Sequence, residues 1–317
     1  INSSLSVADQ QDRLRRMVAG EFHLIYVAPE RMRSPSFRET IGQSNVRLLA
    51  IDEAHCISEW GPDFRPDYAR LGELRGRIGN PPTIALTATA TPLVQRDIVR
   101  LLSLNDPQVF ISGFARENLR FEVRAAQGQR EKSAILLRAI SEAGGGALVY
   151  AATRKACEEV AEMLRENTKL RVGVYHAGLP NDERRNIQDR FMADGFDVVI
   201  ATNAFGMGVD KPDLRLVVHY NVPGSLEAYY QEAGRAGRDG KPARCLLLFS
   251  YADRFIQEFF IDNSYPPKAT VAAVYDYLRA FDTDPIEITQ EELREQLRRS
   301  TGGDGISASE KILEKAG

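Results

Sequence analysis

The stretch GALVYAATRKACEEVAEMLRENTKLRVGVYHA, residues 146–177, decides the fold. Two short apolar, β-branched runs, 146–152 and 171–177, flank a segment at 154–166 whose apolar residues recur with the spacing of an amphipathic helix. Both runs are apolar on both faces, which is typical of strands in a parallel sheet that is buried between helices. This strand–helix–strand unit predicts an α/β fold.

The same alternation continues through most of the chain. We expect further strands at 23–28, 46–52, 82–88, 197–202, 215–220 and 244–249, and helices at 92–102, 182–193 and 226–234. The regularity breaks at 111–129 before a fresh series of strands begins. The sequence therefore predicts two α/β lobes, residues 1–122 and 123–263.

A third region follows paired prolines in DNSYPPKAT (262–270), which end the preceding helix. Residues 264–317 read as helix, short strand (286–289), helix and helix. This order fits a small winged-helix-like module that is cut off before its wing. Three short helices packing onto the second lobe fit equally well, and the sequence does not separate the two interpretations.

Composition narrows the class of protein. The 317 residues are 43% hydrophobic and 27% charged, with no apolar run long enough to cross a bilayer and no secretory leader. The three cysteines (Cys56, Cys157 and Cys245) are far apart, which argues against a disulfide framework or a zinc site and favours an intracellular, reducing compartment. The formal charge of −3 means that nucleic-acid binding would need a local basic surface.

An acidic pair lies in AIDEAHCISEWGPDF (50–64), directly after a predicted strand. Asp52 and Glu53 should therefore lie at the strand's C-terminal end, where open α/β sheets bind ligands. One carboxylate can hold Mg²⁺ through water, and its neighbour can orient or deprotonate an attacking water. Taken alone the pair is a weak signal, because acidic pairs are common on protein surfaces.

The segment QEAGRAGR (231–238) strengthens this interpretation. It spaces Gln231, Arg235 and Arg238 at i, i+4 and i+7, which predicts one face of a helix. Two guanidiniums and an amide suit a phosphate that gains charge in a transition state. A solvated basic helix end explains the arginines but not Gly234 and Gly237, which allow close approach of a backbone.

Two more polar loops, LTATATP (86–92) and TNAFGMGVD (202–210), also follow predicted strands. Each alone could be an ordinary strand–helix turn. Together with the acidic and arginine segments, they predict two facing rims of one cleft.

These residues carry a resemblance to a known family. DEAH, TATA, ATNAFGMGVDKPDLRLVVHYNVP and YYQEAGRAGRDG resemble motifs II, III, V and VI of superfamily-two helicases. HCISEWGPDFRPDYARL (55–71) is similar to the aromatic-rich loop of the RecQ family, and the match runs in order from Asn2 to about Ile261. The resemblance implies two RecA-like lobes, ATP and Mg²⁺ in the cleft, and 3′→5′ unwinding of DNA in repair and recombination.

The resemblance also assigns roles around the nucleotide. Asp52 would bind Mg²⁺, Glu53 would act as the catalytic base, and His55 with Thr87 would relay between nucleotide and DNA. The remaining residues expected at the nucleotide are Gly208, Asp210, Gln231, Arg235 and Arg238, with Arg238 as the arginine finger and Gln231 coupling the lobes.

A second set of residues would contact single-stranded or duplex DNA. Ser58, Trp60, Phe64 and Arg65 belong to the aromatic-rich loop, where stacking on bases tolerates any sequence, as a translocating motor requires. In the second lobe the expected contacts are Thr153, His176, Thr202 and Asn203. His176 has an alternative role as a hydrogen-bonded histidine at the end of a strand.

The sequence departs from the family pattern in three places. No G-x-x-x-x-G-K-[ST] phosphate loop occurs, since the Gly240-Lys241 pair is followed by Pro242. We therefore expect this chain to begin partway through the first lobe and to be inactive by itself. Pro62 occupies a position where the family commonly has His. No cysteine follows Asp262, so we expect the family's zinc module to be either absent or located beyond Gly317.

Two rival functions remain at this point. An RNA helicase of the same superfamily is disfavoured by the aromatic-rich loop. A non-catalytic DNA-binding or regulatory scaffold is favoured only by the missing phosphate loop. A DNA helicase would work in the bacterial nucleoid or in a eukaryotic nucleus, and protein partners cannot be read from the sequence.

Overall fold

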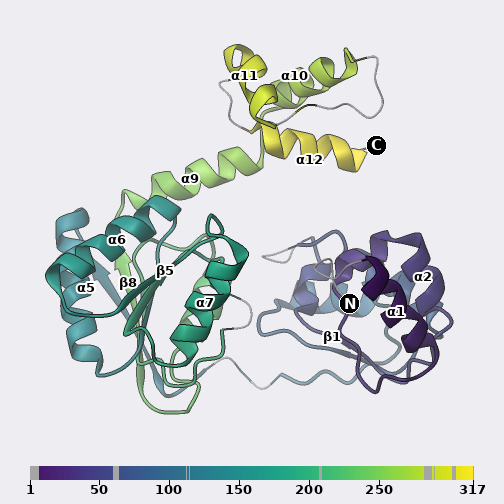
Figure 1. Ribbon diagram of the computed structural model, residues 1–317, viewed down its shortest axis with the longest axis horizontal. Coiled ribbons are helices and arrows are strands. Elements are labelled where there is room, and N and C mark those ends of the chain that lie inside the picture. Colours follow the sequence, from purple (N-terminus) through teal and green to yellow (C-terminus); the bar gives the residue numbers. More distant parts are fainter. Residues whose placement is uncertain are drawn as a thin grey trace. The chain divides into compact units, whose positions relative to one another are not determined.

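The computed structural model describes residues 7–59, 64–111, 113, 115–206, 209–281, 288, 290–301 and 305–316 (Figure 1). The chain divides into two compact units, Ile1–Arg116 with Ser225–Gln231, and Glu117–Gly224 with Glu232–Gly317. The predicted lobe boundary at residue 122 falls inside a strand, β3 (Leu119–Ala125), whose hydrogen-bonded neighbour lies in the second unit. The first lobe therefore ends before β3.

The first unit is built around two parallel strands, β1 (Leu49–Ile51) and β2 (Thr83–Ala85). The helices of this unit are α1 (Val7–Val18), α2 (Pro35–Ile41), α3 (Leu71–Arg77) and α4 (Pro92–Leu101), with short 3₁₀ turns η1 (Pro29–Arg33), η2 (Ala54–Ile57) and η3 (Tyr68–Arg70). Phe37, Ile51 and Leu102 are among the buried residues of its core. The strands at 46–52 and 82–88 are thus confirmed in part, as shorter elements.

The strand predicted at 23–28 is wrong, because this segment pairs with no other strand among the residues that the structure describes. Its side chains still alternate as in a strand. Ile25 and Val27 pack against the core, whereas Leu24 and Tyr26 are 70% and 78% exposed. The apolar pattern was therefore real, but a strand also needs a neighbouring backbone to bond to.

One face of the first unit's sheet is bare. Leu48 and Leu86, at the ends of β1 and β2, are 54% and 52% exposed, and Ile84 within β2 is 46% exposed. Parallel sheets are normally covered on both faces. The residues described here cover only one of them.

The second unit contains a six-stranded, fully parallel sheet in the order β3-β8-β7-β4-β6-β5. Its strands besides β3 are β4 (Ala147–Tyr150), β5 (Val172–Tyr175), β6 (Val198–Ala201), β7 (Leu216–His219) and β8 (Ala243–Phe249). The five strands predicted from 146 to 249 are confirmed. The edge strand β3 was missed, because its sequence LRFEVRA alternates apolar and charged residues instead of being apolar on both faces.

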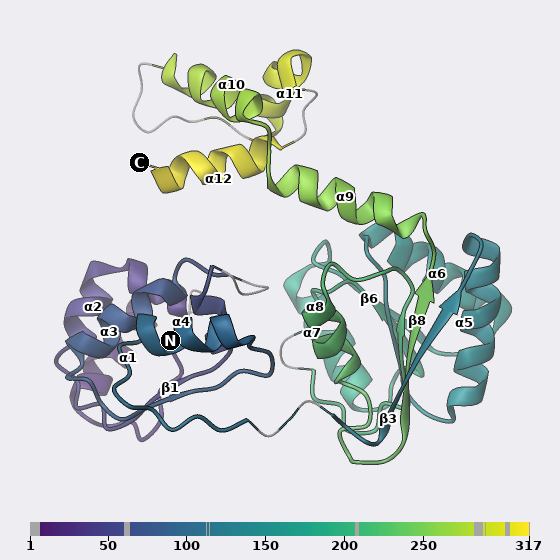
Figure 2. The ribbon, with the colours of Figure 1, turned by 180° about the vertical axis from the view of Figure 1, so that it is seen from behind.

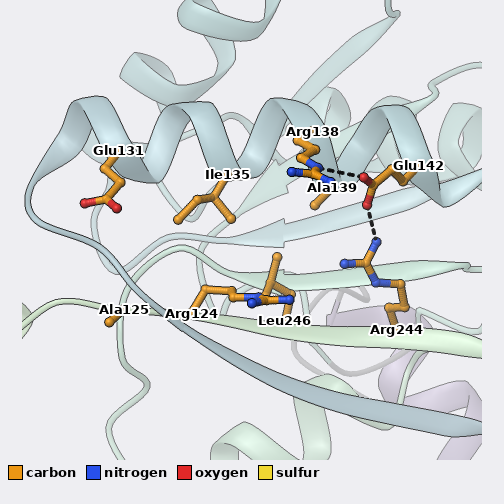
Figure 3. Close-up of a pocket in the computed structure, with 9 residues that line it drawn as sticks. All are labelled: Arg124, Ala125, Glu131, Ile135, Arg138, Ala139, Glu142, Arg244 and Leu246. Atoms are coloured by element: carbon orange, nitrogen blue, oxygen red, sulfur yellow. Dashed lines mark hydrogen bonds and ion pairs between the residues drawn. The ribbon is translucent and has the colours of Figure 1, made fainter.

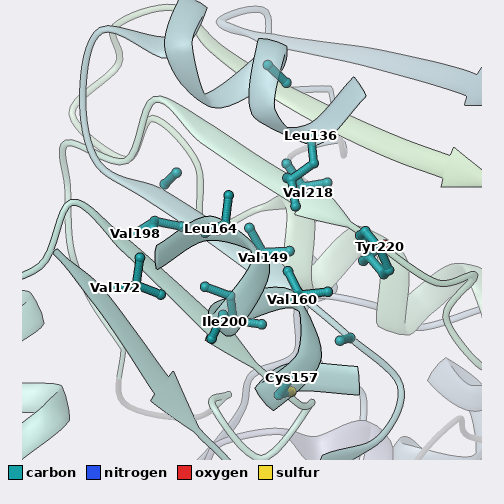
Figure 4. Packing of buried hydrophobic residues seen from close by; sticks show 14 of the residues in the cluster. Leu136, Val149, Cys157, Val160, Leu164, Val172, Val198, Ile200, Val218 and Tyr220 are labelled. Atoms are coloured by element: carbon teal, nitrogen blue, oxygen red, sulfur yellow. The ribbon is translucent and has the colours of Figure 1, made fainter. Parts of the chain in front are cut away.

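Helices cover both faces of this sheet (Figures 1 and 2). On one side lie α5 (Gln129–Ala143) and α6 (Arg154–Asn167), packed through Leu136 and Leu164 on the strands (Figure 4). On the other side lie α7 (Asn181–Met192) and the end of α8 (Leu226–Ala233). Each fully buried leucine of this kind contributes about 1.5–3 kcal/mol.

The C-terminal region consists of α9 (Asp253–Ser264), α10 (Lys268–Arg279), α11 (Gln290–Thr301) and α12 (Ile306–Ala316). The helices predicted after the paired prolines are confirmed. The last three share a small core of Val274, Leu293, Leu297 and Ile306, against which Ile288 packs. Apart from Ile288, the short strand predicted at 286–289 lies outside the described residues. Among the helices that the structure describes, none is long and apolar enough to cross a membrane.

Candidate functional site

The acidic pair of the first unit follows β1, as predicted. The Asp52 side chain is exposed, and its Oδ1 accepts a hydrogen bond from the Glu53 backbone N–H at 2.9 Å. Glu53 has a φ of 48°, in the left-handed region that few side chains other than Asn and Asp adopt. Backbone bonds from Leu86 N–H to the Ile51 carbonyl and from Ala54 N–H to the Leu86 carbonyl fix the turn on either side. The strand ends thus impose this conformation on Glu53.

His55 connects this turn to the end of β2. It is 3% exposed, and its Nδ1 lies 2.9 Å from Thr87 Oγ1 and 3.3 Å from Glu53 Oε2. Because the Thr87 hydroxyl donates to the Thr89 carbonyl, it accepts from a protonated His55 Nδ1. The buried Glu53 Oε2 accepts no hydrogen bond from the described residues. This oxygen is therefore buried beside the His55 ring with its hydrogen-bonding capacity unfilled by the described residues.

The aromatic-rich loop is described only at its two ends. Trp60 and Pro62 lie outside the described residues, whereas Phe64 and Arg65 are half-buried. The Arg65 N–H bonds the Cys56 carbonyl at 3.0 Å and closes the base of the loop. Of the two aromatic residues predicted to stack on bases, Phe64 is therefore described and Trp60 is not.

Ser58 anchors this loop to α4. It is completely buried, and its hydroxyl donates to Asp97 Oδ2 at 2.7 Å. Arg100 donates to the other oxygen of Asp97 at 2.8 Å, and these two bonds hold the pKa of the Asp97 carboxyl below its usual range. A hydroxyl that is buried and paired in this way does not favour the DNA contact predicted for Ser58.

The arginines of the second unit do not lie on one helix face, and that prediction is wrong. Helix α8 ends at Ala233, so Gln231 is helical while Arg235 and Arg238 lie in the turns that follow. Gly237 in these turns has a φ of 53°, which an α-helix does not allow.

The two arginines nevertheless meet the loop after β6. Arg235 Nη1 donates to the Val209 carbonyl at 3.4 Å, and Arg238 Nη1 pairs with Asp210 Oδ1 at 2.6 Å. Gly208, also predicted at the nucleotide, lies outside the described residues. The structure thus brings Arg235, Arg238 and Asp210 together.

A row of polar residues follows three neighbouring strands of the second unit. Thr153 caps α6, its hydroxyl accepting from the Ala156 N–H at 3.1 Å. Because β4, β6 and β5 pair in register, Thr153, Thr202 and His176 lie along one edge of the sheet. Asn203, next to Thr202, is exposed. This edge can present hydroxyl, amide and imidazole groups to a phosphate backbone.

His176 on this edge is 7% exposed, and its Nε2 lies 3.1 Å from Glu158 Oε1. It fits the alternative of a hydrogen-bonded histidine at a strand end. Its other nitrogen, Nδ1, is buried without a hydrogen-bond partner among the described residues. That nitrogen leaves a contact with a ligand possible.

Three polar residues that sequence reasoning did not select also surround the arginine segment. Arg215 donates a hydrogen bond to the Asp239 carboxylate, and Asn118 donates to the Gly237 carbonyl in the same run of turns. They are brought together only by the fold, so no local spacing could have identified them.

The cavities found in the second unit lie elsewhere. One of about 380 Å³ lies between α5 and strands β3 and β8, where Arg138 and Arg244 both point toward Glu142 (Figure 3). Their bonds to Glu142 measure 2.8 and 3.1 Å. None of the predicted site residues lines this cavity, and these charges are already paired.

The donors of the first unit fit a magnesium nucleotide in part. Asp52 offers an exposed carboxylate, the ligand type that Mg²⁺ prefers, and Glu53 offers a carboxylate oxygen that accepts no hydrogen bond from the described residues. The chain's sequence contains no G-x-x-x-x-G-K-[ST] loop to hold the phosphates. Within the described residues no three His, Cys, Asp or Glu side chains are grouped to hold a metal ion such as zinc.

Comparisons with known proteins agree with this geometry. Residues 1–97 match the DEAD/DEAH box helicase family and residues 131–240 match the helicase conserved C-terminal domain. The chain is 43% identical over 265 residues to the ATP-dependent DNA helicase RecQ of Bacillus subtilis, covering 83% of this chain and 44% of that protein. It is 39% identical over 298 residues to the probable ATP-dependent DNA helicase RecS of the same organism, covering 94% and 58%. The chain thus spans about half the length of these relatives.

Solved structures share the fold at low sequence identity. The Mycobacterium smegmatis helicase Lhr, bound to single-stranded DNA and AMP-PNP, matches with a TM-score of 0.60 at 18% identity, covering 94% of this chain and 42% of that one. Mss116p, bound to single-stranded RNA and AMP-PNP, matches with a TM-score of 0.59 at 16% identity, covering 94% and 59%. These likenesses confirm the RecA-like fold of the two lobes.

Proposed function

This chain belongs to the RecQ family of superfamily-two helicases, and from that premise we propose that the natural protein containing it is a DNA-dependent ATPase. It would move 3′→5′ along single-stranded DNA and unwind duplexes in repair and recombination, in the nucleoid or the nucleus. The observation that best supports this is the hydrogen-bonded turn of Asp52, Glu53, His55 and Thr87 at the sheet edge. In this turn, His55 links Glu53, the candidate base for hydrolysis, to Thr87 after the end of β2.

In this proposal each residue of the acidic turn has one task. Asp52 would hold Mg²⁺ through water, and the Glu53 carboxylate, whose Oε2 accepts no hydrogen bond from the described residues, would orient the attacking water and take its proton. When bound, magnesium ATP supplies the phosphoanhydride bond and the cation that offsets phosphate charge. His55 would pass changes at Glu53 to Thr87 through its shared Nδ1.

The arginine segment would stabilise charge on the transferred phosphoryl group. Arg238, the proposed arginine finger, is bonded to Asp210 in this structure, so it would have to release Asp210 to reach a phosphate. Arg235, by contrast, donates a part-buried hydrogen bond to the Val209 backbone carbonyl. Gln231, Gly208 and Asp210 complete the proposed nucleotide contacts.

DNA would be contacted by both lobes. In the first, Trp60 and Phe64 would stack on bases while Arg65 contacts the backbone. In the second, Thr153, His176, Thr202 and Asn203 would follow the phosphates along the sheet edge. Ser58 would act by holding the loop base through Asp97.

The test uses the natural protein that contains this chain. ATP hydrolysis is measured with and without single-stranded DNA, and unwinding is measured on matched DNA and RNA duplexes with 3′ or 5′ tails. The proposal expects DNA-stimulated hydrolysis that requires Mg²⁺, and unwinding of the 3′-tailed DNA duplex. Unwinding of RNA alone would indicate an RNA helicase, and DNA binding without hydrolysis would indicate a scaffold. Either result would overturn the proposal.

A further inference from the structure

The segment after α8 is a run of turns, and it carries both arginines of the proposed ATPase site. A turn on a protein surface is costly to hold in one conformation, since each ordered residue loses about 1–2 kcal/mol of backbone entropy. An arginine that stabilises a transition state must be held in place before the reaction. Residues 234–242 are held by two side chains and by backbone hydrogen bonds.

Arg215, which precedes β7, holds this segment from one side. Its side chain is 15% exposed, and its Nη2 pairs with Asp239 Oδ1 at 2.6 Å while Nη1 donates to the Pro242 carbonyl at 3.0 Å. The Nε of the same guanidinium donates to the Asp213 carbonyl at 3.0 Å. One side chain thus joins the loop after β6 to the turns that carry Arg238.

Asn118, which precedes β3, holds the segment from the other side. Its Nδ2 donates to the carbonyls of Gly237 and Lys241 at 2.7 and 2.8 Å. A Cβ on Gly237 would lie 2.6 Å from this nitrogen and 2.7 Å from the Lys241 carbonyl oxygen, so no larger residue fits there. The close approach therefore accounts for glycine at this position as well as its positive φ.

Backbone bonds complete the connection. The Gly237 N–H donates to the Leu214 carbonyl at 2.9 Å and the Asp239 N–H donates to the Pro212 carbonyl at 3.0 Å. Arg238 lies between these two anchored residues, and its partner Asp210 lies in the same loop after β6 that Arg215 joins. A shift of residues 237–239 would carry Arg238 with it.

We propose that Arg215, Asp239 and Asn118 form a clamp that positions Arg238 for ATP hydrolysis. The clamp residues are positioning residues, because none of them is proposed to touch ATP or DNA. This inference rests on the proposed ATPase activity. It adds three residues to that proposal. The family resemblance assigns a role to none of them, and none is one of the two arginines, Arg235 and Arg238.

The experiment compares Arg215→Gln and Asp239→Asn with the unaltered natural protein, measuring DNA-stimulated kcat per folded molecule and KM for ATP. A misplaced transition-state group lowers kcat and kcat/KM together. We expect each variant to lose about tenfold or more in kcat with KM changed less than about twofold, on that reasoning. Arg171→Gln is the control, since it breaks an ion pair of the same length with Asp197 (2.6 Å), more exposed, beside the edge strand β5. It should leave kcat unchanged.

A double variant separates positioning from general stability. In an Arg238→Ala background the clamp has nothing left to position, so adding Arg215→Gln should lower kcat no further. If the losses multiply, or if both clamp variants keep kcat within about twofold of the unaltered protein, the inference is overturned. If Arg238→Ala abolishes hydrolysis while both clamp variants keep the kcat of the unaltered protein, the clamp fails and the proposed function survives. If the unaltered protein hydrolyses no ATP, both fail.

Discussion

Glu53 holds a backbone conformation that costs about 1–3 kcal/mol for a residue other than glycine. The neighbouring backbone bonds between the ends of β1 and β2 impose it. This strain directs the side chain toward His55 and leaves Oε2 without a hydrogen bond from the described residues. The chemistry of the acidic pair could be predicted from sequence. Its left-handed turn could not, because glutamate gives no local signal for a positive φ.

Glu53→Gln in the natural protein should bind ATP nearly as well as the unaltered protein and hydrolyse it about a hundredfold more slowly, the usual scale for loss of a general base. The amide keeps the shape of the side chain but cannot take a proton. Nucleotide binding and single-turnover hydrolysis would be measured separately. Glu73→Gln, which affects an exposed ion pair with Arg77 on α3, is the control. Normal hydrolysis by Glu53→Gln would remove Glu53 from the role of base.

At the scale of elements, the link between Ser58 and Asp97 fixes the aromatic-rich loop to α4. Asp97→Ala should destabilise the protein by about 1–3 kcal/mol, because it leaves the buried Ser58 hydroxyl without its acceptor. It should also reduce the stimulation of ATP hydrolysis by DNA, since the loop base is no longer held. Urea unfolding and ATPase rates with and without DNA measure the two effects.

Arg100→Ala is the matched control for Asp97→Ala. It removes the exposed partner of the same carboxylate, and exposed ion pairs contribute only about 0–1 kcal/mol. It should therefore leave both stability and DNA stimulation nearly unchanged. Equal effects of the two substitutions would show that the Ser58 bond has no special part in holding the loop.

A second element-scale anchor is the buried pair of Lys132 on α5 and Asp253 on α9. Both side chains are nearly inaccessible, with Nζ 2.8 and 2.9 Å from the two carboxylate oxygens. Lys132→Met should destabilise the second lobe by about 3–5 kcal/mol, because it leaves a buried carboxylate without its cation. Arg138→Met on the same helix breaks only an exposed pair and should cost less than about 1 kcal/mol. Similar urea midpoints for the two variants would contradict this.

The strands that could be predicted from sequence differ from the one that was missed in the apolar pattern of their own residues. The strands from β4 to β8 could be predicted because each is apolar on both faces. Edge strand β3 was missed because only one of its faces is apolar. The turns after α8 had a local signal in Gly234 and Gly237, which the regular spacing of Gln231, Arg235 and Arg238 outweighed.

At the scale of the whole molecule, two α/β lobes and a helical C-terminal region could be predicted from sequence. The position of the first boundary could not, because it depends on β3 pairing with β8, which lies more than a hundred residues away along the chain. The same holds for the clamp around Arg238, whose members come from three separate segments. Motifs identified the reacting groups, and only the fold identified what holds them.

The two lobes should differ in their ability to fold alone. Residues 117–264 contain a sheet covered by helices on both faces, so this fragment should be a monomer that unfolds cooperatively. Residues 7–116 leave Leu48 and Leu86 more than half exposed on one face of a parallel sheet, and Leu24 and Tyr26 more than half exposed in the segment 23–28. Apolar patches of this kind drive association, so we expect this fragment to aggregate and to bind a hydrophobic dye.

Light scattering after size exclusion and urea unfolding would measure both fragments. Tyr26→Lys with Leu48→Lys in residues 7–116 should raise its solubility, because two charges then replace exposed apolar side chains. Glu73→Lys, which reverses the charge of a side chain on α3 that is already charged and exposed, is the control and should help less. If the unaltered fragment stays monomeric and binds no dye, the exposed face does not need a covering layer. The apolar residues on it would then be ordinary surface positions.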